Sequence, residues 1–213
     1  MATATLWSNV GVSMQSALAA ADTVTAITQA SPGNVTATSH GISDGTYITM
    51  DVEGMYQVDE RVFRVDNAAT NTLELEGENT TDYDAFTSGS LYAITFGTTL
   101  AVLTSLSASG GDFDFVDITT IHDNVKKQIP GVANPATYSF EAIWDVSDAG
   151  LVALKAASDA QAKRAFKFTF ANGQIMVFNG YVGATLLPTG NNQDLVKTNV
   201  TITMFGTPTY YSS

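Results

Sequence analysis

The alternation of apolar and polar residues predicts a chain built mainly of β-strands. Between residues 26 and 95, short alternating stretches are separated by glycine, asparagine and aspartate, which favour turns. Five or six short strands in about 70 residues are typical of a compact small barrel or sandwich. The strands are expected at 34–39, 46–52, 61–65, 72–76 and 88–96.

The rest of the chain has longer apolar patterns, and its last predicted strand, "TNVTITMFG", shows two distinct faces. Val200, Ile202 and Met204 lie on one face and are expected to be buried. The opposite row is uncharged and rich in threonine, which is unusual for a surface in bulk water: Asn199, Thr201 and Thr203. Further strands are expected at 98–109, 113–117, 136–146, 165–170 and 174–182.

One α-helix is predicted in "DAGLVALKAASDAQAKRA" (148–165), where alanine, leucine and lysine dominate. Ser147 is the expected N-cap, with Asp148 in the first turn. Lys163 and Arg164 would suit the C-terminal end of the helix, where carbonyl groups are unpaired. The apolar stripe is narrow, so we expect the helix to pack on the outside of a sheet.

A β-hairpin is predicted around Asn172-Gly173, a residue pair favoured in tight primed turns. The strand after the turn is apolar on both faces from Ile175 to Phe178. Such a strand is buried on two sides, either by helix and core or by core and a neighbouring subunit.

The composition adds a low charge density and an uneven distribution of acidity. The net charge is −12, yet only 14% of the 213 residues are charged, against about 25% in a typical soluble domain. Either a stable β-protein with a neutral surface or a subunit largely buried against its neighbours would explain this. Residues 26–95 carry a net charge of −9 and the remaining residues −3, which marks a candidate domain boundary. Duplex nucleic acid would be repelled by the acidic part.

Groups that could support catalysis or bind a metal are sparse. The chain has no cysteine, which excludes disulfides, thiolate metal sites and cysteine nucleophiles. His40 and His122 are its two histidines, so a Ser-His-Asp constellation cannot be argued and a metal site would depend on carboxylates. "DFDFVD" lacks the glycine and closing glutamate of an EF-hand, and strand alternation explains its spacing. We therefore predict no enzyme activity, no metal site and no cofactor.

Other local features have simple explanations. Arg61 and Arg64 are expected to face opposite sides of a strand and to balance local acids. The N-terminal segment lacks Lys, Arg and a sustained apolar core, so no signal peptide is expected. No run approaches the roughly 18 apolar residues of a membrane span. The protein is expected to be soluble and made in a cytoplasm.

The stretch "DITTIHDNVKKQIPG" (117–131) follows neither hydrophobic period. It contains one histidine, two lysines and two aspartates. The residues alone leave three interpretations open: a solvated surface loop, an active-site loop, or a surface that contacts another copy of the chain.

Several motifs, taken in order, resemble the tail tube proteins of long-tailed bacteriophages. They are "DITTIHDN", "KKQIPG", "SFEAIWDVSD", "FKFTFANGQIMVFNGYV" and "TGNNQDLVKTNVTITMFGTP". Together with the N-terminal strand, this resemblance covers residues 97–213. Residues 26–95 resemble a small β-module inserted in many phage tail and fibre proteins, through "ITQASPGNVTATSHGISDG", "GMYQVDERVFRVDNAATNTLEL" and "YDAFTSGS".

The resemblance implies a mainly β fold, with a β-sandwich or barrel tail-tube domain (residues 1–25 and 96–213), one flanking α-helix, and an inserted all-β decoration module (26–95). It implies a structural subunit of homo-hexameric rings, stacked into a tube through which DNA passes during ejection. Implied partners are copies of the chain and other tail proteins, such as tape measure and terminator proteins. DNA would be present only in transit and no membrane would be involved. The implied location is the virion tail, assembled in the host cytoplasm.

The resemblance also assigns roles to particular residues. The 117–131 stretch becomes a long loop that contacts an adjacent ring or subunit, and its lysines are expected to meet acids of a neighbour. The expected contact residues are Asp117, Thr119, Thr120, His122, Lys126, Lys127, Ile129, Pro130 and Gly131. The lumen of such tubes is usually negative, and the candidate wall residues are Asp112, Asp114, Asn199, Thr201 and Thr203. Most of the acidity would lie outside, on the inserted module, where it would keep tubes apart.

Two other classes of function remain to be weighed. A non-catalytic binding module, such as a fibre adhesin or capsid decoration protein, is supported by the likeness of residues 26–95 to fibre modules. It is disfavoured because Tyr56 and Tyr83 are the only aromatic candidates there for gripping a sugar. A hydrolase has no supporting constellation of residues.

Overall fold

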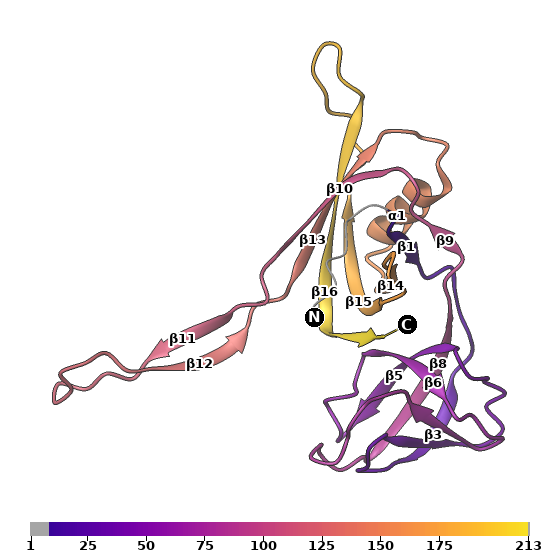
Figure 1. The fold of residues 1–213 in the computed structure, drawn as a ribbon, viewed down its shortest axis with the longest axis vertical. Coiled ribbons are helices and arrows are strands. Elements are labelled where there is room, and N and C mark those ends of the chain that lie inside the picture. Colours follow the sequence, from indigo (N-terminus) through magenta and orange to yellow (C-terminus); the bar gives the residue numbers. More distant parts are fainter. Residues whose placement is uncertain (1–8, 213) are drawn as a thin grey trace.

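Two seven-stranded antiparallel sheets make up most of the structure, a computed structural model that describes residues 9–212 (Figure 1). The first, called the body sheet, has the strand order β10-β13-β16-β15-β14-β1-β9. Its strands are β1 (Gly11–Met14), β9 (Thr98–Thr99), β10 (Leu103–Ser109), β13 (Thr137–Ile143), β14 (Arg164–Thr169), β15 (Ile175–Ala184) and β16 (Lys197–Tyr211).

The second sheet closes on itself and is called the barrel. Strand β8 pairs with both β3 and β5, so that β3, β4, β7, β6, β5 and β8 form a continuous ring without an open edge. Short strands with turn residues between them were predicted for this part of the chain, and this is confirmed. The strands are β2 (Ala17–Leu18), β3 (Asp22–Ile27), β4 (Asn34–Ala37), β5 (Tyr47–Glu53), β6 (Val62–Asp66), β7 (Thr72–Leu75) and β8 (Ser88–Thr95).

Each sheet encloses its own apolar core. The barrel core includes Ile48, Phe63 and Leu73, which are fully buried. The body core lies on one face of the body sheet, where Phe166 and Phe178 stack with ring centroids 5.6 Å apart. Helix α1 (Ala149–Asp159) covers this core with Leu151, Leu154 and Ala157. The fold is therefore mainly β with a single flanking helix in the described residues, as predicted.

The ends of helix α1 differ from the prediction at both sides. Asp148 is the N-cap, because its carboxylate accepts a hydrogen bond from the Leu151 N–H at 2.8 Å, whereas Ser147 binds Asp145. The helix ends at Asp159 because Gln161 adopts a left-handed φ of 48°. The predicted helical residues Lys163 and Arg164 therefore lie beyond the helix, and Arg164 begins β14.

The hairpin between β14 and β15 is confirmed, but its turn is of a different type. The Gly173 N–H donates to the Phe170 carbonyl at 2.9 Å, and Phe170 in turn donates to the Gln174 carbonyl at 2.8 Å. Gly173 has a φ of 87° and Asn172 does not share this conformation. A three-residue loop with a left-handed glycine fits this geometry, whereas a primed turn would need both central residues at positive φ.

Strand β16 confirms the predicted faces and is longer than expected. Val200, Ile202 and Met204 are buried in the body core. The strand continues past Gly206, where a φ of 74° and a register shift against β15 accommodate an irregularity. It ends at Tyr211, so its last residues extend to the barrel.

The two-sided burial of β15 has a cause that the sequence did not reveal. Met176 and Phe178 point into the body core, on the side where α1 packs. Val177, on the opposite side, is fully buried against the barrel residues Tyr47 and Ile94. Both predicted explanations, helix or neighbouring subunit, are therefore wrong for this second side, which the same chain covers.

Candidate assembly surfaces

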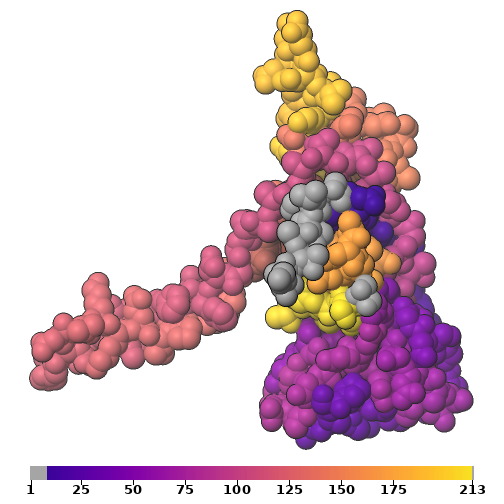
Figure 2. Space-filling view, viewed as in Figure 1, coloured from indigo at the N-terminus to yellow at the C-terminus, as the bar shows by residue number. Residues whose placement is uncertain are grey.

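A two-stranded arm, residues 112–134, projects away from both sheets (Figures 1 and 2). It consists of β11 (Phe113–Asp117) and β12 (Gln128–Ala133), which pair only with each other in the described structure. Every residue of both strands is exposed. An isolated two-stranded hairpin is at best marginally stable in water. The arm therefore lacks the burial that normally stabilises such a hairpin.

The connection between the two arm strands is ordered by polar contacts. The Asp117 carboxylate accepts a hydrogen bond from the Thr119 N–H at 2.8 Å, and the Thr119 hydroxyl accepts one from the Lys127 N–H at 3.0 Å. Asp123 accepts from the Thr120 N–H and forms an ion pair with Lys127. Hydrogen bonding by Thr119 lowers the pKa of Asp117, and the Lys127 ammonium lowers the pKa of Asp123.

The arm also exposes many large apolar side chains. Ile121 near its tip is 97% exposed and Val132 is 85% exposed. Large exposed apolar surfaces on folded proteins mark sites of interaction with another molecule. The apolar arm residues are Phe113, Phe115, Val116, Ile118, Ile121, Val125, Ile129 and Val132.

A second surface is the outward side of four strands of the body sheet, here called the hydroxyl face. Its residues align in three cross-strand rows over β10, β13, β16 and β15, opposite the body core. Only one of the eleven is charged, and that residue, Glu141, binds the Lys197 ammonium at 2.8 Å. The rows are Ser109, Thr137, Thr203 and Tyr181; Ser107, Ser139, Thr201 and Gly183; and Ser105, Glu141 and Asn199.

Strand β10 leaves one edge of the body sheet open. It pairs with β13 on one side, and no described strand lies on its other side. Its sequence, "LTSLSAS", contains no charge and no proline. Proteins normally protect an exposed edge with such residues or cover it, because unpaired backbone groups recruit another strand. This edge is therefore suited to pairing with another chain.

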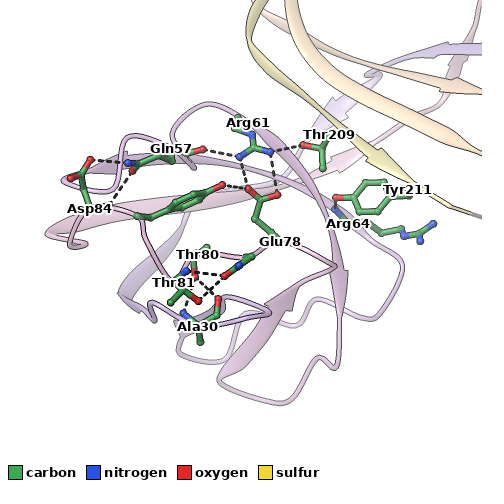
Figure 3. Close-up of polar contacts among 12 residues, drawn as sticks. Ala30, Gln57, Arg61, Arg64, Glu78, Thr80, Thr81, Asp84, Thr209 and Tyr211 are labelled. Atoms are coloured by element: carbon green, nitrogen blue, oxygen red, sulfur yellow. Dashed lines mark hydrogen bonds and ion pairs between the residues drawn. The ribbon is translucent and has the colours of Figure 1, made fainter.

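The barrel, by contrast, is attached to the body sheet through a closely packed junction (Figure 3). Arg61 binds Glu78 at 2.6 Å and reaches Thr209 of β16 at 3.4 Å. The Arg64 N–H donates to the Tyr211 hydroxyl at 2.6 Å, and its guanidinium lies 4.5 Å from the Tyr211 ring centroid. Burial raises the pKa of Tyr211 well above its ordinary value. The end of β16 thus belongs to both parts of the molecule.

Further contacts from β14 and β15 complete the junction. The Asn179 side-chain amide donates to the Glu60 carbonyl at 2.6 Å and to the Thr49 hydroxyl at 3.0 Å. The Lys167 ammonium lies 5.1 Å from the Tyr47 ring centroid and 5.2 Å from that of Phe96. Burial lowers the pKa of Lys167. These polar and aromatic contacts surround the buried apolar residues of the junction and hold the barrel in a defined position.

Comparison with known families accounts for this combination of surfaces. Residues 53–213 match the model of the family described as phage tail tube protein, TTP. The chain belongs to the phage tail tube protein family. The matched range begins at the end of β5, so it includes the later strands of the barrel as well as the body sheet. A search of curated proteins found no match.

Family membership makes this chain a structural component of a phage tail. The two histidines of the tail tube subunit lie on different elements. His40 is buried in the barrel, where its Nδ1 accepts from the Ile42 N–H at 3.0 Å, and His122 is exposed on the arm. No group of three or more metal-ligating side chains occurs among residues 9–212. Within the same range, no helix has the length and apolar character needed to cross a bilayer.

The predicted contact residues of the tail tube subunit all fall on the arm. Asp117, Thr119 and Thr120 order its turn, while Ile129 to Gly131 lie within β12 rather than at the end of a loop. Lys127 forms its ion pair with Asp123 of the same arm, and Lys126 is exposed. The other apolar residues of the arm were not predicted as contact residues. Their signal in the sequence was that they are apolar yet follow neither the strand period nor the helix period.

The candidate lumen residues separate into two groups. Asn199, Thr201 and Thr203 lie together on the hydroxyl face. Asp112 and Asp114 lie at the base of the arm, where Asp114 accepts a hydrogen bond from the Asn134 side chain at 3.0 Å. The structure therefore does not assemble all five into one surface.

The two arginines confirm one expectation and contradict another. Each pairs with a local acid, Arg61 with Glu78 and Arg64 with Glu76, as predicted. Their side chains do not face opposite sides, because both reach the end of β16. Arg61 precedes β6, so strand alternation does not govern its direction.

Proposed function

We propose that this tail tube subunit assembles with copies of itself into hexameric rings, and that stacked rings form the channel for DNA during ejection. The observation that carries the proposal is the arm, whose apolar side chains find no core within the described chain. Burial of apolar surface is the main driving force of stable association. A second copy supplies the missing surface if rings stack or pack side by side.

The arm is proposed as the contact between subunits or between rings. Its turn carries Asp117, Thr119, Thr120, His122, Lys126 and Lys127, and its second strand carries Ile129, Pro130 and Gly131. The apolar side chains around these residues would be buried by the neighbour, and the ordered turn would present them in one arrangement. The ion pair between Asp123 and Lys127 satisfies that lysine within the arm, so Lys126 is the remaining candidate for a neighbour's acid.

Strand sharing between subunits is proposed at the free edge of β10. The uncharged edge of β10 supports this, because pairing with the next copy would satisfy its backbone groups. Repeated around a ring, such pairing would join the hydroxyl faces into one continuous wall.

The chain is proposed to divide into a tail-tube domain (1–25 and 96–213) and an inserted decoration module (26–95). Separate apolar cores support the division. Strands β2 and β3 also pair with β8, so the hydrogen-bonded barrel begins at Ala17. The acidic module would lie on the outside, where like charges keep neighbouring tubes apart.

Other tail proteins, such as tape measure and terminator proteins, are proposed partners, with DNA present only during transit. Assembly is proposed to take place in the host cytoplasm, before the tail joins the particle. These assignments rest on the family resemblance, and the arm and the free edge supply the surfaces that such an assembly needs.

Electron microscopy of the purified chain tests the proposal. We expect rings or long tubes of constant width, and an Ile129→Asp, Gly131→Val double variant that stays folded but does not polymerise. Ile129→Asp alone avoids the close approach of a new side chain at position 131 to the Asp114 carbonyl, 3.0 Å away. Tyr56→Asp, at a barrel position 72% exposed, is the matched control. Unimpaired tube growth by the arm variants, or monomers from the parent chain, would refute the proposal.

A further inference from the structure

The hydroxyl face is nearly free of charge across its whole area. Its eleven residues comprise serine and threonine with one asparagine, one glycine, one tyrosine and Glu141. Solvent-facing protein surfaces normally have about a quarter to a third of charged residues. The absence of charge therefore sets this face apart from an ordinary solvated sheet.

Two ion pairs lie close to the face, and Asp194 lines the same pocket as Glu141 and Lys197. At one end, the Lys197 ammonium holds the Glu141 carboxylate at 2.8 Å and lowers the pKa of that carboxyl group. Beyond the other end, Lys163 lies 5.2 Å from the Phe205 ring centroid and forms an ion pair with Glu60. Each of the two pairs has no net charge, and the nearest acids outside the pairs are Asp194 at one end and Asp112 at the base of the arm.

Most of the acidic residues of the chain lie away from the face. Residues 26–95 account for a net charge of −9 out of −12. Asp112 and Asp114 are at the base of the arm and not on the face. Because the screening length is about 8 Å at physiological salt, the local potential at the face depends mainly on its own residues.

We propose that the hydroxyl face is the wall of the DNA channel and that this wall is electrically neutral. The inference rests on the proposed tube function and departs from the negative lumen that the resemblance implied. A wall of lysines would bind the DNA phosphates and release counterions, whereas a wall of acids would repel the phosphates. Both effects depend strongly on salt concentration. Hydroxyl groups stay hydrated and exert no net force on the phosphate charge, so DNA moves along the channel without being held or repelled.

The chain contains no cysteine, so a single introduced thiol can report the potential at the face. Ser139 lies in the middle row, exposed, between Ser107 and Thr201, and Ser139→Cys changes one atom. The rates at which this thiol reacts with a small cationic and a small anionic methanethiosulfonate would be measured in assembled tubes. The rate with the cationic reagent is divided by the rate with the anionic reagent. This ratio, divided by the same ratio for a free thiol, measures the local potential.

For the neutral wall we expect a normalised ratio within about twofold of one, with little change between low and high salt. A bulky polymer-linked maleimide should modify the free subunit but not the tube, because the wall is inside. Tyr56→Cys on the acidic barrel is the control, and its normalised ratio should exceed one and fall as salt is added.

The outcomes separate the inference from the proposed function. Failure of the parent chain to form tubes overturns both. If the thiol of Ser139→Cys reacts with the bulky reagent as fast in tubes as in the free subunit, that result overturns the assignment of the face to the channel. Tubes that exclude this reagent but favour the cationic probe about tenfold or more, in a salt-dependent way, overturn neutrality and leave the tube intact.

Discussion

The arm and the barrel both extend from the body sheet, and they differ in where their apolar side chains lie. The barrel closes into a ring of strands and buries residues such as Phe63 completely, with a second buried patch against β15. The arm has two strands and exposes Phe115 by 62%. The barrel thus buries its apolar residues within one chain, whereas the arm leaves its apolar side chains exposed in the described chain.

This difference separates two ways of adding to a fold. The barrel has its own core, and the junction with Thr209 and Tyr211 joins it to the body sheet. The arm has no core of its own. In the free subunit, it is held only at its base, where it joins the body sheet. One subunit can therefore carry both a module with its own closed core and an arm whose apolar side chains are exposed.

The largest expected effect comes from truncating matched phenylalanines in the two regions. Phe63→Ala should lower the free energy of unfolding of the subunit by about 3–5 kcal/mol, because it opens a cavity in a closed core. Phe115→Ala should leave it nearly unchanged, because the ring is already in water. Urea unfolding of both variants checks this, and an equal loss in both would contradict the comparison.

Assembly should show the reverse order of sensitivity. Ile121→Asp places a charge at the most exposed apolar position of the arm, and we expect at least a tenfold higher concentration to be needed for tubes, about 1.4 kcal/mol per contact. The unfolding transition of the free subunit should not move. Sedimentation across a concentration series measures the threshold, with Tyr56→Asp as the control. A threshold equal to that of the parent would remove the arm tip from the interface.

A smaller effect is expected at the junction. Tyr211→Phe removes the hydroxyl that accepts from the Arg64 N–H and leaves that donor without its partner in a largely buried place. The cost should be about 1–3 kcal/mol of unfolding free energy. Tyr210→Phe, at a position 69% exposed, is the control and should change little. Equal stability of the two variants would show that the barrel does not depend on this bond.

The smallest expected effect is the pH response of the arm turn. The folded-state pKa values of Asp117 and Asp123 lie below the ordinary 3.8, so their stabilising contribution is present above that value. It is lost as pH falls through the lowered folded-state values. Amide hydrogen exchange at Thr119 and Thr120, corrected for intrinsic rates, should show protection at pH 5 that weakens as the pH is lowered below the ordinary aspartate pKa of 3.8. Protection that persists in acid would contradict these contacts.

The sequence predicted those features that depend on local patterns. Alternation identified the barrel strands β4 to β8 and the two faces of β16, but β2 and β3 were missed. Asn172-Gly173 located the hairpin. The N-cap was misplaced by one residue because Ser147 and Asp148 are both good caps, and the choice depends on which side chain reaches the third N–H of the helix. Patterns of this kind resolve an element but not its ends.

Features that depend on contacts distant in sequence could not be predicted. The apolar stretch that contains Val177 was expected to be covered by a helix or a neighbouring subunit. Nothing near Val177 in the sequence indicates that the barrel packs against it. The direction of Arg61 was missed for the same reason. The predicted contact residues all lie on one segment, and that segment proved to be a paired ribbon in which Ile129 lies within a strand.

The position of β16 between β13 and β15 has a consequence for protein synthesis. The ribosome makes β16 after every other strand described, yet this strand joins β10 and β13 to the remaining strands of the body sheet. Until it emerges, that sheet stays in two pieces and the barrel lacks the Tyr211 contact. A chain released before this point would lack the strand that joins the two pieces, so in the proposed assembly it could not contribute a continuous wall.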